Sequence, residues 1–324
     1  MSEINLVDNK WNIGSHIPFE NNITNSIKFA IDNGMYSFQI FLGSPQAYDR
    51  ACISETDITS SAKLLSKFPT NLFIHTPFLF NLCGSVKQLA WEGDSKQDSI
   101  TSKVVNSIQY ELEILDKIHT QIKNESKDKV RMGVVVHPGN YSDVTKGLEK
   151  IAETINMINF PKNTNVKLLL ENSSGGGNKL ATTFEQIGTI IKHIHPEKRK
   201  YIGVCVDTAH IYGFGSYDLR EIKNVDKLFS EFDDYIGLQY FSLLHLNDSS
   251  QSSTDKRKDA FLGSKKDVHE LIGHGYIWKD NVKPLIYLLD KCKELNNTPI
   301  ILETSPSDVQ TIHILSCCCK SGKI

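Results

Sequence analysis

The feature that most constrains the fold of this chain is the regular alternation of short β-rich runs with longer helical patterns. Eight runs have the composition of strands, at 10–13, 37–42, 71–75, 131–137, 167–171, 201–207, 239–246 and 299–303. Helical patterns lie between them, at 22–33, 56–67, 98–122, 144–158, 184–195, 219–229 and 279–295, and a last short helix is expected after Pro306. Strands that alternate with helices predict an α/β protein with a parallel sheet. Eight such repeats in 324 residues favour a closed (β/α)8 TIM barrel over an open sheet.

The strand candidates also indicate a single domain. Runs such as 134–136 and 168–170 are apolar throughout, as expected for barrel strands that are covered on both faces. No low-complexity linker divides the chain, so residues 1–324 are predicted to form one domain, with a polar surface extension near 120–129. Hydrophobic residues make up 40% and charged residues 23%, which is typical of a soluble globular protein. No apolar run approaches the roughly 20 residues that cross a bilayer, so no membrane association is expected.

Cysteine usage and the N-terminus favour an intracellular protein, in the cytoplasm or the nucleus. The first residues, MSEINLVDNKWN, lack the basic and then apolar pattern of a signal peptide. None of the seven cysteines lies in a CxxC pair, and reduced thiols are expected. Cys317–Cys319 lie too close together for the usual zinc spacing, so 317–324 is predicted to be an exposed tail.

Six consecutive strand candidates end in or near a histidine or a carboxylate. The six residues are His75, His137, Glu171, Asp207, His245 and Glu303. In a parallel barrel the carboxyl ends of all strands meet at one rim, so these side chains are expected to converge. Several carboxylates buried together are costly unless cations neutralise them. Imidazoles and carboxylates are ligands that zinc or a similar cation accepts, so the pattern predicts a metal site.

Three further residues offer ligands nearby. Asp267 and His269, in GSKKDVHELIGHG, are two apart and would point to the same side of an extended segment. His210 lies three residues after Asp207. Taken singly, Asp207 could cap a helix, His210 could bind a carbonyl, and Asp267 with His269 could form a surface turn. Beside the six strand-end residues, the three are predicted to hold a further ion.

Eight stretches together resemble the endonuclease IV family, the zinc-dependent apurinic/apyrimidinic (AP) endonucleases of base-excision repair. They run in family order across nearly the whole chain: GSHIP at 14–18, HTPFLFNL at 75–82, VVHPGN at 135–140, LENSSGGGNKL at 170–180, CVDTAHIYGFGSYD at 205–218, LHLNDS at 244–249, GSKKDVHELIGHGYI at 263–277 and ILETS at 301–305. The combination is far more specific than any one of these motifs.

The resemblance implies a barrel with three zinc ions. The first would be bound by His75, His137 and Glu171, and Glu171 would also be the catalytic carboxylate that bridges to the second. Asp207, His245 and Glu303 would complete the second site, and His210, Asp267 and His269 would form the third. The implied reaction is hydrolysis of the phosphodiester 5′ to an abasic sugar in double-stranded DNA, which leaves a 3′-hydroxyl.

The resemblance also indicates how DNA would be held. Phe78 aligns with a wedge tyrosine of the family, although it could instead be a core residue beside Phe80. Gln46 occupies the position of a wedge arginine, which is a departure from the family pattern. Five cations flank the third group of ligands and are predicted to contact phosphates: Lys256, Arg257, Lys258, Lys265 and Lys266. They could also be a solvated loop, because the net charge of −2 gives no overall attraction for nucleic acid.

Two other classes of function fit parts of the sequence. A sugar isomerase or epimerase also places acids and histidines around one or two metals at a barrel rim, but it does not need the third group. A non-catalytic DNA-damage-binding protein would be signalled by a lost ligand, and every candidate position holds a residue able to ligate a metal. Metal stoichiometry distinguishes the nuclease from the isomerase, and the chain is expected to act as a monomer.

Overall fold

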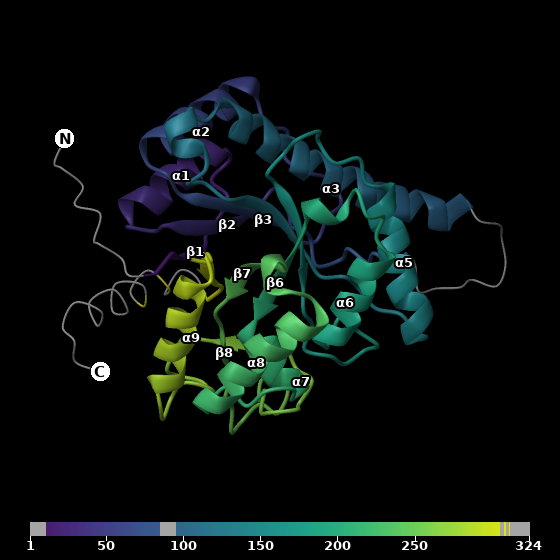
Figure 1. The fold of residues 1–324 in the computed structure, drawn as a ribbon, viewed down its shortest axis with the longest axis vertical. Coiled ribbons are helices and arrows are strands. Elements are labelled where there is room, and N and C mark those ends of the chain that lie inside the picture. Colours follow the sequence, from purple (N-terminus) through teal and green to yellow (C-terminus); the bar gives the residue numbers. More distant parts are fainter. Residues whose placement is uncertain (1–10, 85–94, 305–307, 309–310, 312–324) are drawn as a thin grey trace.

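Eight parallel strands close into a barrel whose order is β1-β10-β7-β6-β5-β4-β3-β2, in a computed structural model that describes residues 11–84, 95–304, 308 and 311 (Figure 1). The strands are β1 (Ile13–His16), β2 (Ser37–Phe41), β3 (Asn71–His75), β4 (Met132–Val136), β5 (Lys167–Glu171), β6 (Ile202–Asp207), β7 (Phe241–His245) and β10 (Ile300–Leu302). Strand β1 pairs with both β10 and β2, which closes the sheet. The predicted TIM barrel is confirmed.

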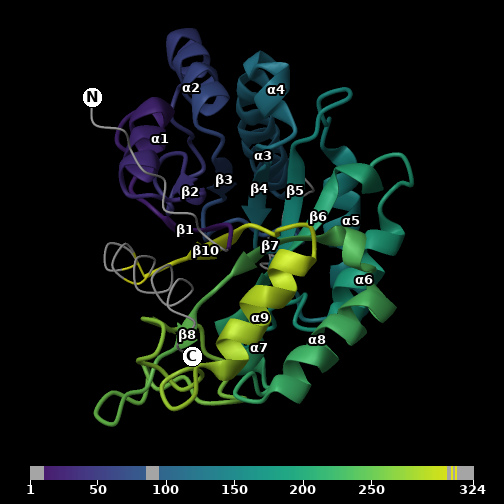
Figure 2. The same ribbon diagram turned by 60° about the vertical axis from the view of Figure 1, so that its left-hand side comes forward.

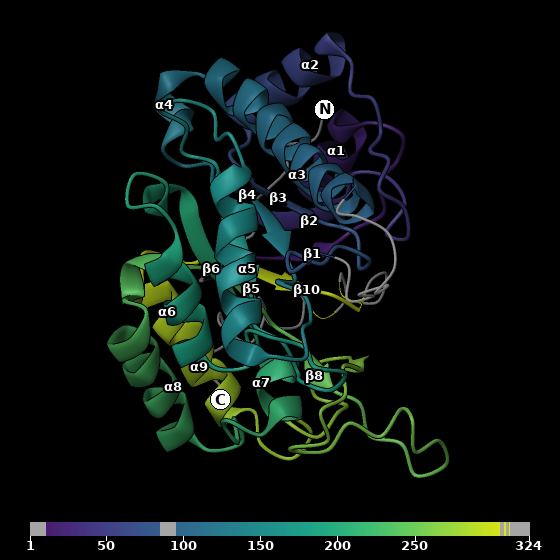
Figure 3. The ribbon, with the colours of Figure 1, turned by 90° about the vertical axis from the view of Figure 1, so that its right-hand side faces the viewer.

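Helices surround the barrel and connect its strands (Figures 1, 2 and 3). They are α1 (Ile23–Asp32), α2 (Glu55–Lys67), α3 (Ser95–Gln121), α4 (Asn124–Lys127), α5 (Val144–Met157), α6 (Phe184–His193), α7 (Thr208–Phe214), α8 (Ile222–Tyr235) and α9 (Lys283–Glu294). Several begin where a side-chain oxygen accepts a hydrogen bond from the backbone three residues on: Asn22 caps α1, Ser54 caps α2, Asp143 caps α5 and Thr183 caps α6. No helix among the described residues is long and apolar enough to cross a membrane.

The first strand lies later in the sequence than expected. The run 10–13 was the sequence-based candidate, whereas β1 comprises Ile13–His16. Glycine and serine have a low intrinsic tendency to form strands, so the pairing with β2 and β10 determines this element. A side chain at Gly14 would meet the carbonyl oxygen of Ser37, so only glycine allows the two backbones to approach.

Several short elements were not anticipated. Helix α7 directly follows β6, and the two-residue strands β8 (Asp248–Ser249) and β9 (His269–Glu270) pair antiparallel outside the barrel. The loop between β8 and β9 projects from the body of the barrel (Figure 3). These elements are too short to show periodicity, so the sequence pattern alone does not reveal them.

Other predicted segments have mixed outcomes. The segment 120–129 contains α4 and is mostly exposed. The Cys-rich tail at 317–324 lies outside the described residues, as does most of the helix expected after Pro306. That the whole chain forms one domain therefore stays a prediction.

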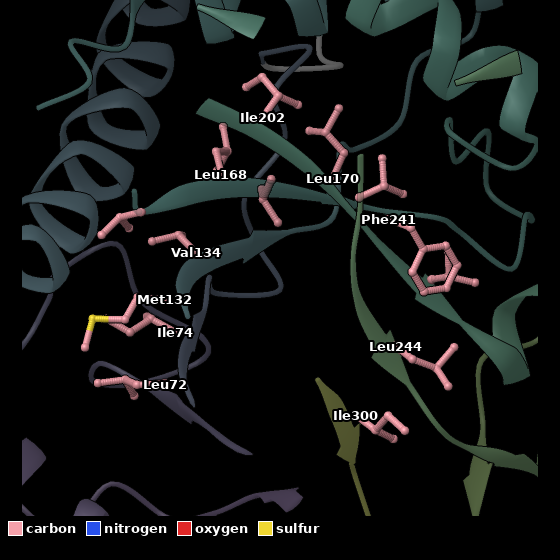
Figure 4. Packing of buried hydrophobic residues seen from close by; sticks show 14 of the residues in the cluster. Leu72, Ile74, Met132, Val134, Leu168, Leu170, Ile202, Phe241, Leu244 and Ile300 are labelled. Carbon is pink, nitrogen blue, oxygen red and sulfur yellow. The ribbon is translucent and has the colours of Figure 1, made fainter. Parts of the chain in front are cut away.

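Strand residues alternate between two hydrophobic layers. Side chains such as Leu72, Ile74, Val134, Leu168 and Leu244 pack toward the surrounding helices in the larger core (Figure 4). The alternate positions fill the barrel interior with a separate cluster of six buried residues: Phe73, Val135, Leu169, Cys205, Leu243 and Ile301. This division follows from the two-residue period of a strand. It also fixes which side chains point inward at the end of each strand.

Candidate metal centre

The candidate ligands form the next layer above the apolar interior of the barrel. Each of the six interior residues is followed, two positions later, by one of the six strand-end residues: His75, His137, Glu171, Asp207, His245 and Glu303. Because side chains two apart point to the same face of a strand, all six project into the barrel mouth. The convergence predicted from the sequence is present in the structure.

Glu171 divides its two carboxylate oxygens between two groups of imidazoles. Its Oε2 lies 3.2 Å from Nε2 of His75 and 3.5 Å from Nε2 of His137. Its Oε1 lies 3.0 Å from Nδ1 of His245, and that nitrogen lies 3.2 Å from Oε2 of Glu303. The Glu171 side chain is completely buried. A carboxylate in this position can serve two cations at once.

A third group lies at the entrance. Oδ1 of Asp267 is 3.0 Å from Nε2 of His210 and 3.2 Å from Nε2 of His269. Asp207 belongs to this group as well as to the second, because one of its oxygens lies within 4.8 Å of ligand atoms of both His210 and His269. The side chain of Asp267 is 33% exposed, whereas those of Glu171 and His245 are completely buried. The carboxylate of the third group therefore lies closer to solvent than the carboxylate shared by the first two.

The distances within the outer group resemble those between ligands of one metal ion. Nε2 of His210 and Nε2 of His269 are buried and make no hydrogen bond with the described residues, although Asp267 is so close. Ligand atoms about 2.1 Å from a tetrahedral ion are separated by about 3.4 Å, which resembles these distances. Two buried imidazole nitrogens that face one carboxylate oxygen without hydrogen-bond geometry call for an explanation. A bound divalent cation supplies one, so the donor set fits a metal.

In His75 and His210, one ring nitrogen is hydrogen-bonded to a backbone carbonyl, which leaves the other nitrogen for the site. Nδ1 of His75 donates to the carbonyl of Thr76 at 2.7 Å, and Nδ1 of His210 donates to the carbonyl of Asn172 at 2.8 Å. A carbonyl can only accept, so in each neutral ring the proton lies on Nδ1 and the lone pair on Nε2. Such outer contacts are typical of metal-binding histidines.

Asp207 and His210 each have both an ordinary structural role and a place in the site. Oδ1 of Asp207 caps α7 by accepting from the backbone N–H of His210 at 2.8 Å, and its Oδ2 faces the other candidate ligands. One nitrogen of His210 is satisfied by a carbonyl, as the simpler interpretation proposed. Oδ2 of Asp207 and Nε2 of His210 therefore remain available to the site.

Burial lowers the pKa values of the candidate histidines His137, His210 and His269, whereas neighbouring carboxylates raise them. Burial lowers the pKa of His137 to about 4, so this ring is neutral at pH 7. Burial also opposes a charge on His210, but Asp207 and Asp267 outweigh it and raise the pKa of His210 to about 10. For His269 the same carboxylates overcome burial and raise the pKa to about 9. In the metal-free protein, protons on the outer imidazoles neutralise the carboxylates.

Sequence reasoning missed the polar side chains that support the ligands. Nδ2 of Asn247 donates to Oδ2 of Asp207 at 2.7 Å and to Oε2 of Glu303 at 2.9 Å. Gln39, on β2, contacts both His245 and Glu303. The sequence did offer a signal for Gln39, which is a polar residue within a buried strand. Its position faces the barrel interior, because Phe41, two residues later, lines the cavity above the candidate ligands.

Asp248 organises the loop that carries the outer ligands. This buried carboxylate accepts hydrogen bonds from five backbone N–H groups, those of Ser249, Gly273, Gly275, Ile277 and Trp278. Burial raises its pKa, and the hydrogen bonds oppose that shift. Asp248 thus ties β8 to the segment that follows β9, and the sequence analysis did not single it out.

A cavity of about 860 Å³ opens directly above the candidate ligands. Phe78 lies on its wall and is 61% exposed, so the alternative that Phe78 is a core residue is wrong. Its ring lies 5.2 Å from that of Phe41 and 5.9 Å from that of His75, measured between centroids. The backbone N–H of Phe78 donates to the carbonyl of Pro45 at 3.0 Å, which joins its loop to the loop of Gln46.

Gln46 is exposed. The nearby cation in the same loop, Arg50, does not take the place of the arginine that the family has at position 46. The guanidinium of Arg50 binds the carbonyls of Ser44, Ala47 and Tyr48. It also contacts the buried carboxylate of Glu111 at 3.4 Å. Arg50 therefore holds the loop in shape and is not available to enter DNA.

The five candidate phosphate-binding cations differ in how free they are. Lys256, Lys258 and Lys265 are exposed. Arg257 is 91% exposed but pairs with Asp255 of its own loop at 3.1 Å. The ammonium of Lys266 donates to the carbonyls of Lys256 and Asp259, so Lys266 stabilises the conformation of its own loop. Their contact with phosphate stays a prediction.

Comparisons with known proteins agree with this architecture. A family model described as a xylose isomerase-like TIM barrel matches residues 27–316. A protein of Ureaplasma parvum named "Probable endonuclease 4" is 30% identical over 311 residues, which cover 94% of this chain and 88% of that protein. The crystal structure of endonuclease IV from Thermus thermophilus matches with a TM-score of 0.72 at 23% identity, over 95% of this chain and 99% of that one. A D-tagatose 3-epimerase-like protein matches with a TM-score of 0.63 at 17% identity, over 94% and 95% of the two chains. The two structural likenesses concern the fold.

Proposed function

This chain belongs to the endonuclease IV family, and from that premise we propose that it is an AP endonuclease. Its substrate would be double-stranded DNA with an abasic site. It would hydrolyse the phosphodiester 5′ to the abasic sugar and leave a 3′-hydroxyl. The observation that carries the proposal is the convergence of nine imidazole and carboxylate side chains beside a cavity open to solvent.

Three zinc ions are the proposed cofactors. The first would be held by His75, His137 and Glu171, the second by Glu171, Asp207, His245 and Glu303, and the third by His210, Asp267 and His269. When bound, zinc supplies Lewis acidity toward water and phosphate oxygens. Asp207 also contacts the third group, so its carboxylate is a candidate link between the second and third sites.

The residues of the chain determine where that chemistry would occur. Glu171 would fix the separation of two cations, because its two oxygens face different imidazoles. The carbonyls of Thr76 and Asn172 hold the rings of His75 and His210 with their lone pairs inward. Asp267, at the entrance, would meet the substrate first, because its side chain is the most exposed of the nine.

Metal binding at the outer group is expected to weaken as the pH falls. His210 and His269 have pKa values of about 10 and about 9, so below about pH 9 both hold a proton that a metal ion must displace. For each proton displaced, the apparent metal affinity falls about tenfold when the pH falls by one unit. Displacement of two protons therefore lowers the affinity about 100-fold per pH unit. Competition with a chelator at pH 6, 7 and 8, corrected for protonation of the chelator, measures this dependence. An affinity that does not change with pH would contradict it.

Duplex DNA would have to be opened before its backbone reached the metal centre. Unstacking is least costly where a base is already missing, which favours an abasic site. Phe78 is proposed to enter the gap, because its exposed ring lies at the edge of the cavity and can stack on neighbouring bases. Gln46 is on the adjoining loop and could add a hydrogen bond there.

Replacing Phe78 with alanine is expected to weaken binding to an abasic duplex by about 5- to 150-fold. Loss of one stacked aromatic ring costs about 1–3 kcal/mol. The exposed side chain contributes little to folding, so the circular dichroism spectrum should not change. Fluorescence anisotropy in the presence of a chelator measures binding without cleavage. Phe29→Ala is the matched control, because Phe29 is 40% exposed on α1 and does not line the cavity. Equal affinities for both variants would exclude the wedge.

The proposed reaction is tested with a duplex that carries one abasic analogue. Zinc-replete protein should cut that strand once, on the 5′ side of the analogue, and leave an intact duplex uncut. A DNA polymerase should extend the product, because extension requires a 3′-hydroxyl. Failure to cut the abasic duplex would refute the proposal, and a product that is not extended would refute the assigned bond.

The third group of ligands supports this proposal over a sugar isomerase or epimerase. Such enzymes need one or two metals, whereas His210, Asp267 and His269 form a further group beside the first two. A non-catalytic damage-binding protein would not require a full set of ligands. All nine come from one chain, so the proposed site needs no residue of a second subunit, and we propose a monomer that acts inside the cell.

A further inference from the structure

Gln39 is a buried side chain that contacts two candidate ligands of the same ion. It lies on β2, has no exposed surface, and projects into the barrel beneath the metal centre. Its amide Oε1 lies 3.0 Å from Nε2 of His245, and its Nε2 lies 2.8 Å from Oε1 of Glu303. The same Nε2 lies 3.0 Å from Nδ1 of His16. An amide offers two donors and one acceptor group, and all are used here.

The orientation of this amide follows from the chemistry of its neighbours. An ionised carboxylate only accepts hydrogen bonds, so the group that faces Glu303 must be the NH2 of Gln39. A flipped amide would place two oxygens 2.8 Å apart. The carbonyl oxygen of Gln39 therefore faces His245, and Nε2 of His245 must carry a proton to donate to it.

This orientation determines how both ligands face the ion. With its proton on Nε2, a neutral His245 presents the lone pair of Nδ1, the atom that lies 3.0 Å from Glu171 and 3.2 Å from Glu303. Glu303 has Oε1 engaged by Gln39, which leaves Oε2 directed at His245 and Asn247. The second donor of Gln39 points to Nδ1 of His16, so a neutral His16 carries its proton on Nε2.

We propose that Gln39 is a positioning residue that fixes the tautomer of His245 and the rotation of the Glu303 carboxylate. It thereby selects Nδ1 of His245 and Oε2 of Glu303 as the atoms that meet the second ion. This inference depends on the proposed metal centre. Loss of such an outer contact typically lowers metal affinity about 10- to 100-fold.

Two substitutions separate the two contacts. Gln39→Met keeps the length and volume of the side chain but removes the donors and the strong acceptor, so both ligands lose their support. Gln39→Glu keeps an acceptor for His245 but places a second carboxylate against Glu303. Ser37→Ala is the matched control, because Ser37 is equally buried on the same strand and contacts Asn12 and Asn71 rather than a candidate ligand.

The experiment measures ring nitrogens and zinc affinity, neither of which requires turnover. Zinc-loaded protein labelled with 15N-histidine is studied by two-bond 1H–15N correlation. Competition with a chelator gives the affinity of the zinc ion that is bound most weakly. The wild type and Ser37→Ala should show His245 with a proton on Nε2 and zinc on Nδ1. Gln39→Met should lose that fixed pattern and bind one zinc about 10- to 100-fold more weakly. Gln39→Glu should keep the pattern and still bind one zinc more weakly.

The outcomes distinguish this inference from the metal centre itself. A wild-type spectrum and wild-type zinc affinity in Gln39→Met would overturn the role of Gln39 while leaving the metal centre intact. If Gln39→Met does not fold, Gln39→Glu carries the test, and an unchanged zinc affinity in that variant would overturn the role. A wild-type protein in which zinc does not reach His245 would instead refute the proposed second site.

Discussion

Glu171→Gln is expected to lower the rate of incision at an abasic site by at least about 10³-fold, equivalent to about 4 kcal/mol. The buried carboxylate directs one oxygen toward His75 and His137 and the other toward His245. Glutamine has the same shape but no charge, and its NH2 group cannot bind a cation. Both inner ions would therefore lose a shared ligand. Single-turnover cleavage of an abasic duplex measures the effect.

A surface substitution provides the control for this prediction. Glu153→Gln, on the exposed side of α5, makes the same chemical change away from the site and should cut at the wild-type rate. Far-UV circular dichroism should be unchanged in both variants, because the barrel does not depend on the charge of Glu171. A Glu171→Gln protein that cuts DNA at the normal rate would rule out Glu171 as the shared ligand.

Removal of the metal ions is expected to abolish incision completely and to lower the melting temperature by at least about 5 °C. An ion present at 100 times its dissociation constant stabilises the folded state by about 2.7 kcal/mol, and each kcal/mol corresponds to about 2–4 °C in a chain of this size. Among the described residues, imidazoles and the amide of Asn247 lie against the carboxylates of Glu171, Asp207 and Glu303, and bound cations would add positive charge there. Activity and calorimetry before and after chelation measure both losses.

Re-addition of zinc after removal of the chelator should restore both properties. Magnesium is the informative control, because it prefers six oxygen ligands and retains water, whereas the candidate groups are rich in imidazole. Full activity in the chelator-treated protein would show that incision does not depend on metal. Restoration by magnesium alone would contradict the choice of zinc.

The barrel could be predicted from the sequence because its strands are both apolar and regularly spaced. The runs 71–75 and 167–171 coincide with β3 and β5 to the residue. Strand β1 was misplaced because Gly14 and Ser15 follow no strand pattern and are held by their neighbours in the closed sheet. Local preference describes a strand only where it agrees with the tertiary pairing.

The candidate ligands could be found because they end strands, whereas their supports could not. His75, Glu171 and Asp207 each interrupt an apolar run, which makes them visible in the sequence. Gln39 lies in the middle of a strand and Asn247 beyond the end of one, and their importance appears only when the barrel closes and brings β2 near the ends of β7 and β10. The engagement of Lys266 with its own loop also depends on tertiary contacts that a charge pattern cannot show.

Anomalous scattering at the zinc absorption edge, from crystals of the zinc-loaded protein, shows whether the barrel mouth binds three zinc ions. Three peaks are expected: one among His75, His137 and Glu171, one among Glu171, Asp207, His245 and Glu303, and one among His210, Asp267 and His269. Elemental analysis of the same sample should give about three zinc ions per chain. A map without peaks in the barrel mouth, or with these side chains turned away from one another, would contradict this expectation.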